Sequence, residues 1–359
     1  MPDSGCELFA VWDELTYTVK FNANGGTGTM ADEEFTYGIA QSLTANVFKK
    51  DGCTFAGWAT SATGGKVYDD KQSVNNLTTT PGGTVTLFAV WKEALYMVID
   101  LSGGSSAKSY PVSYLSEVPN NGTWPDAYKT TKLVLRKVKK GSNTAGGSMS
   151  KDMWGGVFEL TQRQTTQIYG TFLKKGNYNG YAYAYLTIGE KYPMIHSLES
   201  NVELGETINT RLNSRVSSLN FVIPTKDQWI YACRAGTTTP FNNGTSDEAG
   251  LKKVAVCLKK SSYYTAYEDV GSRDPNAWGL YDMHGNVSER VGSVTGPYYS
   301  YAGTSYLITC MGGFFNGGVD TCKADGERSE LAYQSFSHDS ASGAADRNSW
   351  GYRVFAVTK

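Results

Sequence analysis

Cysteine and histidine are the residue types in this chain that could supply a nucleophile or bind a transition metal. The cysteines are far apart in the sequence and form no Cys-x-x-Cys pair, which argues against a zinc ribbon or a thioredoxin-type redox motif. We expect them to be buried free thiols. The histidines form no His-x-x-x-His pair, so histidine metal chemistry is not predicted. The residues concerned are Cys6, Cys53, Cys233, Cys257, Cys310 and Cys322, with His196, His284 and His338.

The clearest element near these residues is a strand followed by a short helix in residues 220–236, NFVIPTKDQWIYACRAG. Gln228 follows Thr225 by three residues, which is the spacing of a capping box at the start of a helix. Gly236 suits the left-handed end of such a helix. Trp229 and Cys233 fall on one helical face, so we expect this face to pack into the core.

The overall composition limits the classes of function. A length of 359 residues suggests about two or three domains. The formal charge is −1, which gives no electrostatic basis for binding nucleic acid or an anionic membrane. The 40 glycines and 24 tyrosines are typical of a turn-rich, β-leaning protein. We expect no transmembrane segment, and any export signal or lipid anchor is expected to lie outside this sequence.

A repeat is visible at the start of the chain. PDSGCELFAVW (2–12) aligns with PGGTVTLFAVW (81–91), so residues 1–13 are interpreted as the end of a preceding repeat and residues 14–93 as a complete one. Tyr17, Val19 and Phe21 alternate with polar residues as in a strand, and Asn24-Gly25-Gly26 indicates a turn. YTVKFNANGGTGTM, FAGWAT and LFAVW together resemble the Listeria–Bacteroides (internalin B-type) repeat. This resemblance implies a small β-grasp-like spacer of a bacterial surface protein.

Residues 94–359 are interpreted as one domain, because several motifs within them resemble the formylglycine-generating enzyme (sulfatase-modifying factor) family. The motifs are VFELTQ, IPTKDQWIYACRAG, NAWGLYDMHGNVSERV, a Gly-Gly pair at 312–313, and GYRV near the end. The resemblance implies an α+β, C-type-lectin-like fold with little regular secondary structure. It also implies that the C-terminal segment forms the ligand-facing surface.

The chain differs from that family at the positions of the enzyme's catalytic cysteines. The aerobic enzyme carries two closely spaced cysteines after its Gly-Gly motif, because paired thiolates bind copper and attack the substrate cysteine. Here no cysteine lies between Gly313 and Cys322, and Cys310 precedes the motif. We therefore predict that this domain is not an enzyme. A sulfatase-modifying or related oxidoreductase is kept as the alternative.

One cofactor is implied by the resemblance. Relatives hold calcium near the Gly-Asn-x-x-Glu turn, at positions that match Asp282, Asn286 and Glu289. The alternative interpretation is structural, with Asn286 supplying a positive-φ turn and Glu289 a buried ion pair. We expect at most one structural Ca²⁺. His284, in the same turn, is expected to be a structural residue.

A repeat followed by a domain of this type resembles the variable proteins of diversity-generating retroelements. The resemblance implies a non-catalytic, monomeric receptor on the bacterial cell surface, or secreted, that binds an unknown protein or glycan and no nucleic acid. A carbohydrate-binding adhesin of fixed specificity is the other alternative.

Such diversification produces codons that cannot encode Trp, Met, Gln, Glu or Lys, and none of these residues occurs in residues 312–322. We expect a variable binding region at about 312–352, with its diversified side chains exposed on one face; burial of Phe315 is the alternative for that residue. Gly351, Arg353 and Val354 are assigned to the scaffold, and Arg353 is expected to be buried beside a carboxylate or carbonyl. The candidate ligand-binding residues are Phe314, Phe315, Val319, Asp320, Tyr333, Ser335, Phe336, Ser337 and His338.

Overall fold

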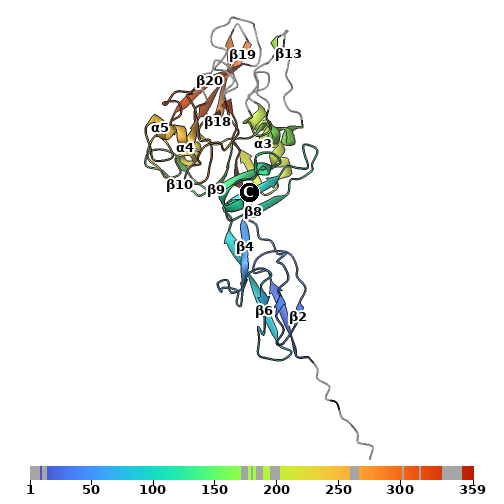
Figure 1. The fold of residues 1–359 in the computed structure, drawn as a ribbon. Helices are drawn as coiled ribbons and strands as arrows, with labels where there is room; N and C mark the ends of the chain where they lie inside the picture. The colour runs from blue at the N-terminus through green and yellow to red at the C-terminus, as the bar shows by residue number, and fades with distance from the viewer. Residues whose placement is uncertain are drawn as a thin grey trace, which may run out of the picture. The chain divides into compact units, whose positions relative to one another are not determined.

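The chain forms two compact units (Figure 1). The described elements of the first are all strands, and the second combines helices with strands, which confirms the predicted α+β class. One unit contains Met1–Ala94 and Tyr114–Ser116, and the other contains Leu95–Ser113 and Glu117–Lys359. The computed structural model describes residues 9, 14–170, 177–178, 181–182, 189–194, 203–258, 267–300, 303–314, 317–333 and 350–359.

The first unit is a mixed sheet of four strands in the order β2-β1-β6-β4. The first and last strands, β1 and β6, run parallel to each other, and the other neighbours are antiparallel. A short antiparallel pair, β3 with β5, lies outside this sheet. The strands are β1 (Thr16–Asn22), β2 (Glu33–Thr36), β3 (Gln41–Ser42), β4 (Cys53–Ala59), β5 (Ser73–Val74) and β6 (Thr84–Glu93).

The core of this unit is aromatic. Trp58 is completely buried, and its ring lies 4.9 Å from the ring of Phe21 and 4.8 Å from that of Phe55. Tyr17 and Val19 are also buried, which confirms the strand pattern expected for YTVKF. The predicted turn is present as well, because Asn24 and Gly25 both have positive φ angles.

The second unit is organised around a six-stranded sheet in the order β15-β22-β12-β9-β7-β8. The last strand of the chain, β22, lies between β15 and β12 and is antiparallel to both. The beginning and the end of this unit therefore join the same sheet. The strands are β7 (Tyr96–Asp100), β8 (Val112–Leu115), β9 (Lys132–Val138), β12 (Met153–Gly156), β15 (Leu219–Val222) and β22 (Phe355–Thr358). Tyr114 and Leu115 of β8 are grouped with the first unit.

A second sheet contains four strands in the order β20-β19-β18-β21, and its longer strands are drawn in orange in Figure 1. Residues 267–283, which lead into it, contain only turns and loops, as expected for a domain with long irregular connections. Three short strand pairs complete the unit. The strands are β18 (Ser288–Ser300), β19 (Gly303–Met311), β20 (Glu327–Tyr333) and β21 (Trp350–Gly351), with the pairs β10 (Gly141–Ser142) and β11 (Ser148–Met149), β13 (Asn177–Tyr178) and β14 (Tyr181–Ala182), and β16 (Ala255–Val256) and β17 (His284–Gly285).

The helices are short. They are α1 (Pro119–Gly122), the 3-10 helix η1 (Asp126–Lys129), α2 (Gln162–Tyr169), α3 (Glu203–Arg215), α4 (Lys226–Arg234) and α5 (Glu248–Val254). None of the helices in the part of the chain that the structure describes is long and apolar enough to cross a bilayer.

Helix α4 confirms the local prediction. The Gln228 amide N–H donates to the Thr225 hydroxyl at 3.2 Å, and the Thr225 amide N–H donates to the Gln228 side chain at 2.9 Å, which closes the capping box. Trp229 and Cys233 are fully buried. The left-handed end begins one residue earlier than expected, at Ala235, and continues through Gly236.

Candidate functional site

The motif segments meet at a buried ion pair between Arg353 and Glu289, each of which is 1% exposed. Arg353 Nε donates to both carboxylate oxygens at 2.9 Å, and the guanidinium also donates to the carbonyl oxygens of Gly156 and Tyr281. The Trp229 indole N–H donates to Glu289 Oε2 at 2.6 Å. This arrangement confirms that Arg353 is a buried cation with a carboxylate partner, and it gives Glu289 a structural role.

A second buried carboxyl group, that of Glu159, holds the next turn. Its Oε2 accepts from the Asn286 side chain at 2.7 Å, and its Oε1 accepts from the Val287 amide at 3.0 Å. Burial raises the pKa of Glu159 well above its usual range, and the nearby charges of Asp282 and Glu289 act in the same direction. Glu159 was not among the predicted site residues, although an acidic residue inside the apolar segment VFEL was a visible signal.

Asp282 is buried beside these groups in a left-handed conformation with φ 56°. Its Oδ2 accepts from the Gly271 amide at 2.6 Å, whereas Oδ1 has no hydrogen-bond partner among the described residues. Burial raises the pKa of Asp282 to about 6, and the Gly271 N–H and the charge of Arg353 oppose this rise.

The three expected calcium ligands do not fit a calcium ion. Both oxygens of Glu289 accept hydrogen bonds from Arg353, whose positive charge repels a metal cation at that position. The amide oxygen of Asn286 accepts from the Glu268 N–H at 3.0 Å. In this set, Oδ1 of Asp282 is the one side-chain oxygen that has no hydrogen-bond partner among the described residues. Among the described residues, no group of three or more Asp, Glu, His or Cys is placed to hold a metal. Asn286 instead supplies the positive-φ turn, at φ 59°.

His284 is a buried structural residue, as expected. The Asn242 amide N–H donates to its Nε2 at 3.1 Å, so the proton is on Nδ1, which donates to the Cys322 carbonyl oxygen at 2.6 Å. Burial lowers the pKa of His284 to about 4, which keeps the ring neutral at physiological pH. Cys233 Sγ lies 3.7 Å from Nε2, but it is fully buried and burial raises its pKa. This pair is therefore not poised for nucleophilic attack.

The glycine pair that follows β19 makes a turn that only glycine suits. Gly312 and Gly313 have φ angles of 89° and 72°. A Cβ atom on Gly313 would lie 2.6 Å from the sulfur atom of Cys322 and 2.8 Å from the carbonyl oxygen of Thr321. The turn therefore brings Cys322 back against the glycine pair, and Cys322 is fully buried.

Most cysteines in the described part of the chain are buried, as expected, whereas Cys6 lies outside the described residues. Cys233, Cys257 and Cys322 are buried free thiols, and Cys310 is buried within β19. Cys53, in the first unit, is a free thiol that is only half-buried.

The structure places only part of the expected binding region. The prediction that Phe314 is exposed is wrong: its side chain is 7% exposed. Phe314 directly follows the buried Gly312–Gly313 turn, and its apolar ring gains free energy from burial. Val319 is half-buried, and Asp320 is exposed and paired with Lys323 at 2.6 Å. The backbone of Tyr333 belongs to β20. Phe315, Ser335, Phe336, Ser337 and His338 lie outside the described residues.

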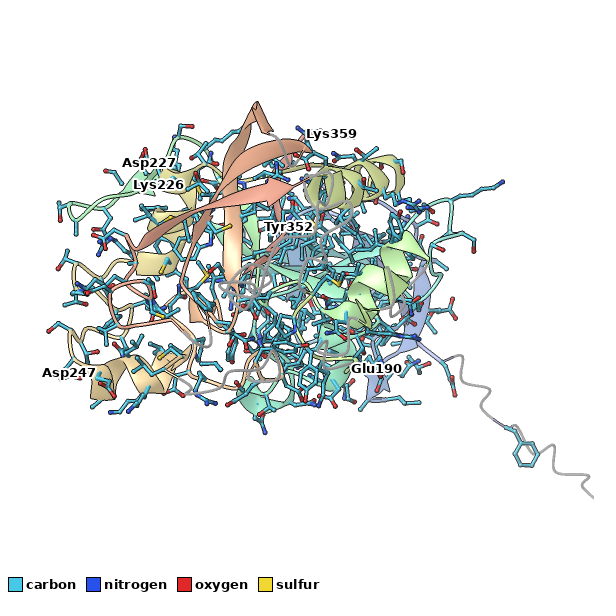
Figure 2. All side chains as sticks on the ribbon, turned by 90° about the horizontal axis from the view of Figure 1, so that it is seen from above. Glu190, Lys226, Asp227, Asp247, Tyr352 and Lys359 are labelled. Atoms are coloured by element: carbon cyan, nitrogen blue, oxygen red, sulfur yellow. The ribbon has the colours of Figure 1, made fainter. Side chains whose placement is uncertain are left out.

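The scaffold residues at the end of the region are placed as predicted. Gly351, Arg353 and Val354 are all buried. Tyr352, which Figure 2 labels within the second unit, is also buried, and its hydroxyl donates to the Asn209 side chain in α3 at 2.6 Å. Arg290 in β18 makes a bidentate pair with Glu206, also in α3. Helix α3 is therefore attached to this framework by two polar contacts that the sequence analysis did not foresee.

Comparisons with known proteins agree with both resemblances. The family described as Listeria-Bacteroides repeat domain matches residues 17–90, and the family described as sulfatase-modifying factor enzyme 1-like domain matches residues 181–356. A putative Gly-rich membrane protein of Evansella cellulosilytica is 32% identical over 111 residues, which are 30% of this chain and 12% of that protein. The chain thus spans a small part of the length of this relative.

Several solved structures are similar over 63% of this chain. Treponema denticola variable protein 1 has 17% identity and a TM-score of 0.45, with 95% of that chain covered. PvdO from Pseudomonas aeruginosa has 19% identity and a TM-score of 0.43, with 94% covered, and CarF has 14% identity and a TM-score of 0.41, with 97% covered. The family matches, rather than these distant structures, carry the assignment: the chain contains a Listeria-Bacteroides repeat domain followed by a sulfatase-modifying factor enzyme 1-like domain.

Proposed function

We propose that the second domain is a non-catalytic binding module of a surface-exposed or secreted bacterial receptor, and that the repeat acts as its spacer. The ligand is a protein or a glycan, and the segment after the Gly312–Gly313 turn contributes to the binding surface. The repeat family supports the extracellular location, since the resemblance implies a spacer of surface proteins.

One observation carries the proposal. The polar side chains of the family motifs are used within the domain: Arg353 pairs with Glu289, Asn286 with Glu159, and His284 with backbone groups. Among the described residues, these motifs leave no nucleophile paired with a base at the surface. The exposed residues among the described positions of 309–326 are instead Gly318, Asp320 and Asp325. Exposed loops on a rigid scaffold are common binding sites.

Binding is tested by screening the full chain against a phage-displayed random peptide library and on a glycan array. We expect saturable binders whose affinity falls about tenfold or more when Asp320→Lys reverses an exposed charge or when residues 335–338 are replaced by a Gly/Ser segment. The matched control is Asp69→Lys, because Asp69 also forms an exposed i,i+3 pair with a lysine, at 2.6 Å, but in the repeat. Ligands whose affinity is unchanged by both Asp320→Lys and the replacement of residues 335–338 would contradict the proposed binding surface. Selective glycan binding that survives these changes would favour a fixed-specificity adhesin.

The enzymatic alternative is supported by the family match alone. It is tested by incubating the protein with a Cys-x-Pro-x-Arg peptide, copper and oxygen, and by assaying aldehyde formation by mass spectrometry. We expect no aldehyde. Turnover that is lost in Cys322→Ser would overturn the non-catalytic proposal.

A further inference from the structure

Two cysteines that are distant in sequence meet in one apolar cluster. Cys257 directly follows β16, and Cys322 lies beyond the Gly312–Gly313 turn. Both are free thiols, and each is the largest influence on the pKa of the other. They share a buried cluster with Phe241, Leu251 and Ala255. This contact is not the pairing of neighbouring cysteines that the enzyme uses, since the two residues come from different segments of the fold.

Backbone contacts hold the two segments together independently of the thiols. The Leu258 amide donates to the Gly317 carbonyl oxygen at 3.3 Å. Leu258 directly follows Cys257, and Gly317 belongs to the loop that precedes Cys322. The carbonyl oxygen of Cys322 accepts from His284, and His284 belongs to β17, which pairs with β16. The sulfur atoms are therefore brought together by a preformed framework.

The two thiols differ in reactivity. The hydrogen bond from Cys322 lowers the pKa of Cys257, and the attraction of Lys252 adds to this effect. The same hydrogen bond, together with burial, raises the pKa of Cys322. Cys257 is 8% exposed and Cys322 is 0% exposed. Cys257 is thus the thiol that ionises first and that a small oxidant meets first, and Cys322 is placed to react second.

We propose that Cys257 and Cys322 form an oxidisable dithiol that closes to a disulfide on reaction with a low-molecular-weight disulfide such as oxidised glutathione. The thiolate of Cys257 attacks one sulfur of the oxidant, which breaks its S–S bond and releases one thiol. Cys322 then attacks the sulfur of Cys257 in the mixed disulfide and releases the second thiol, which takes up the proton of Cys322. Two protein thiols are oxidised and one small-molecule disulfide is reduced to two thiols.

The bond would tie β16 to the loop that carries Val319 and Asp320. Because it closes a long stretch of chain, it would restrict the unfolded state and stabilise the folded one. We expect the oxidised protein to have a Tm higher by roughly 5 °C or more than the reduced protein. Amide exchange in residues 317–321 should slow as well.

The test uses the full chain, reduced and then incubated with oxidised glutathione. We expect an intact mass lower by about 2 Da, protection of Cys257 and Cys322 from alkylation, and a crosslinked peptide that contains both residues. Cys257→Ser and Cys322→Ser should each lose the 2 Da change and the Tm rise, whereas Cys233→Ser and Cys53→Ser should retain them. If a variant does not fold, peptide mapping of the oxidised parent protein still shows whether Cys257 and Cys322 are crosslinked.

Three results would overturn the proposal. They are a crosslink between Cys322 and Cys233 or Cys310 in place of Cys257, a stable glutathione adduct on Cys257 that does not resolve, and full alkylation of both residues after oxidation. The proposed binding function does not depend on this bond, so either proposal can fail alone.

Discussion

At the scale of single residues, the polar groups in the centre of the second domain are structural because each is matched by a specific partner. Arg353 satisfies the carboxylate of Glu289 and two carbonyl groups at once, which is the geometry needed to keep a guanidinium in the interior. Glu159 and Asp282 are less well compensated, since burial raises the pKa of each.

The Arg353–Glu289 pair should therefore be essential for stability. Replacing Arg353→Met leaves the Glu289 carboxylate buried without a counterion, and we expect a loss of about 3–5 kcal/mol in the free energy of unfolding, measured by urea titration. Lys252→Ala removes an exposed i,i+4 pair with Glu248 and should leave the midpoint unchanged. Equal effects of the two substitutions would show that the buried pair has no special role.

Asp282 should give the stability of this domain a pH dependence. Its folded-state pKa is raised to about 6, so the folded state binds a proton more tightly than the unfolded state. The contribution of Asp282 to the stability of the folded state is therefore fully present at low pH. It is lost as pH rises from the usual pKa of an aspartate to the folded-state pKa of about 6. Asp282→Asn keeps the left-handed conformation and removes the charge, so at pH 7.5 the variant should be more stable than the parent by about 1–3 kcal/mol.

Denaturant titrations at pH 4 and pH 7.5 check this prediction. The difference between the variant and the parent should shrink or reverse at pH 4, where the parent carboxyl group is protonated. A variant that is less stable than the parent at both values would show that Asp282 is ionised and compensated in the folded protein.

At the scale of elements, two helices begin with the same device in different environments. Thr225 is exposed at the start of α4, whereas Thr161 is fully buried at the start of α2. The hydroxyl of Thr161 also donates to the Lys129 carbonyl oxygen at 2.8 Å. The capping box at Thr225 was predicted from the sequence and the one at Thr161 was not, although in both cases Gln follows Thr by three residues.

The two caps should differ in energetic importance. Thr225→Ala removes one cap and should cost about 1 kcal/mol, while Thr161→Ala also leaves a buried carbonyl group without its donor and should cost about 2–3 kcal/mol. The measurement is chemical unfolding of the second domain. Thr→Ser at each position retains the hydroxyl and serves as the control. If both alanine variants lost the same free energy of unfolding, the hydrogen bond from Thr161 to the Lys129 carbonyl oxygen would contribute nothing to stability.

At the scale of the whole molecule, the chain consists of two units with separate cores, and each should unfold by itself. Trp58→Ala removes a fully buried ring from the repeat and should destabilise that unit by about 3–5 kcal/mol, without moving the transition of the second domain. Trp58→Phe should cost less, because it keeps an aromatic ring and removes an indole N–H that has no partner among the described residues. Differential scanning calorimetry separates the transitions, and a shift of both by Trp58→Ala would contradict independent cores.

The sequence by itself determined the features that depend on local pattern. Alternation in YTVKF predicted the first strand, and the Thr225–Gln228 spacing predicted helix α4. The arginine in GYRVF predicted a buried cation with a carboxylate or carbonyl partner. Motif order also gave the two domain families. These inferences succeed because each depends on residues that are close in sequence or on a requirement, such as charge compensation, that holds in any fold.

Only the tertiary structure decided which distant groups meet. Asn286 and Glu289 were expected to bind calcium, but in the structure Asn286 pairs with Glu159 and Glu289 pairs with Arg353. In each pair the two residues are more than sixty positions apart in the sequence. It buried Phe314, which the composition of its segment had placed at the surface. It also placed Cys257 and Cys322, which are distant in sequence, in one buried cluster. Hydrogen bonding and burial depend on distances in space, and the sequence does not give these until the strands that carry the residues have paired.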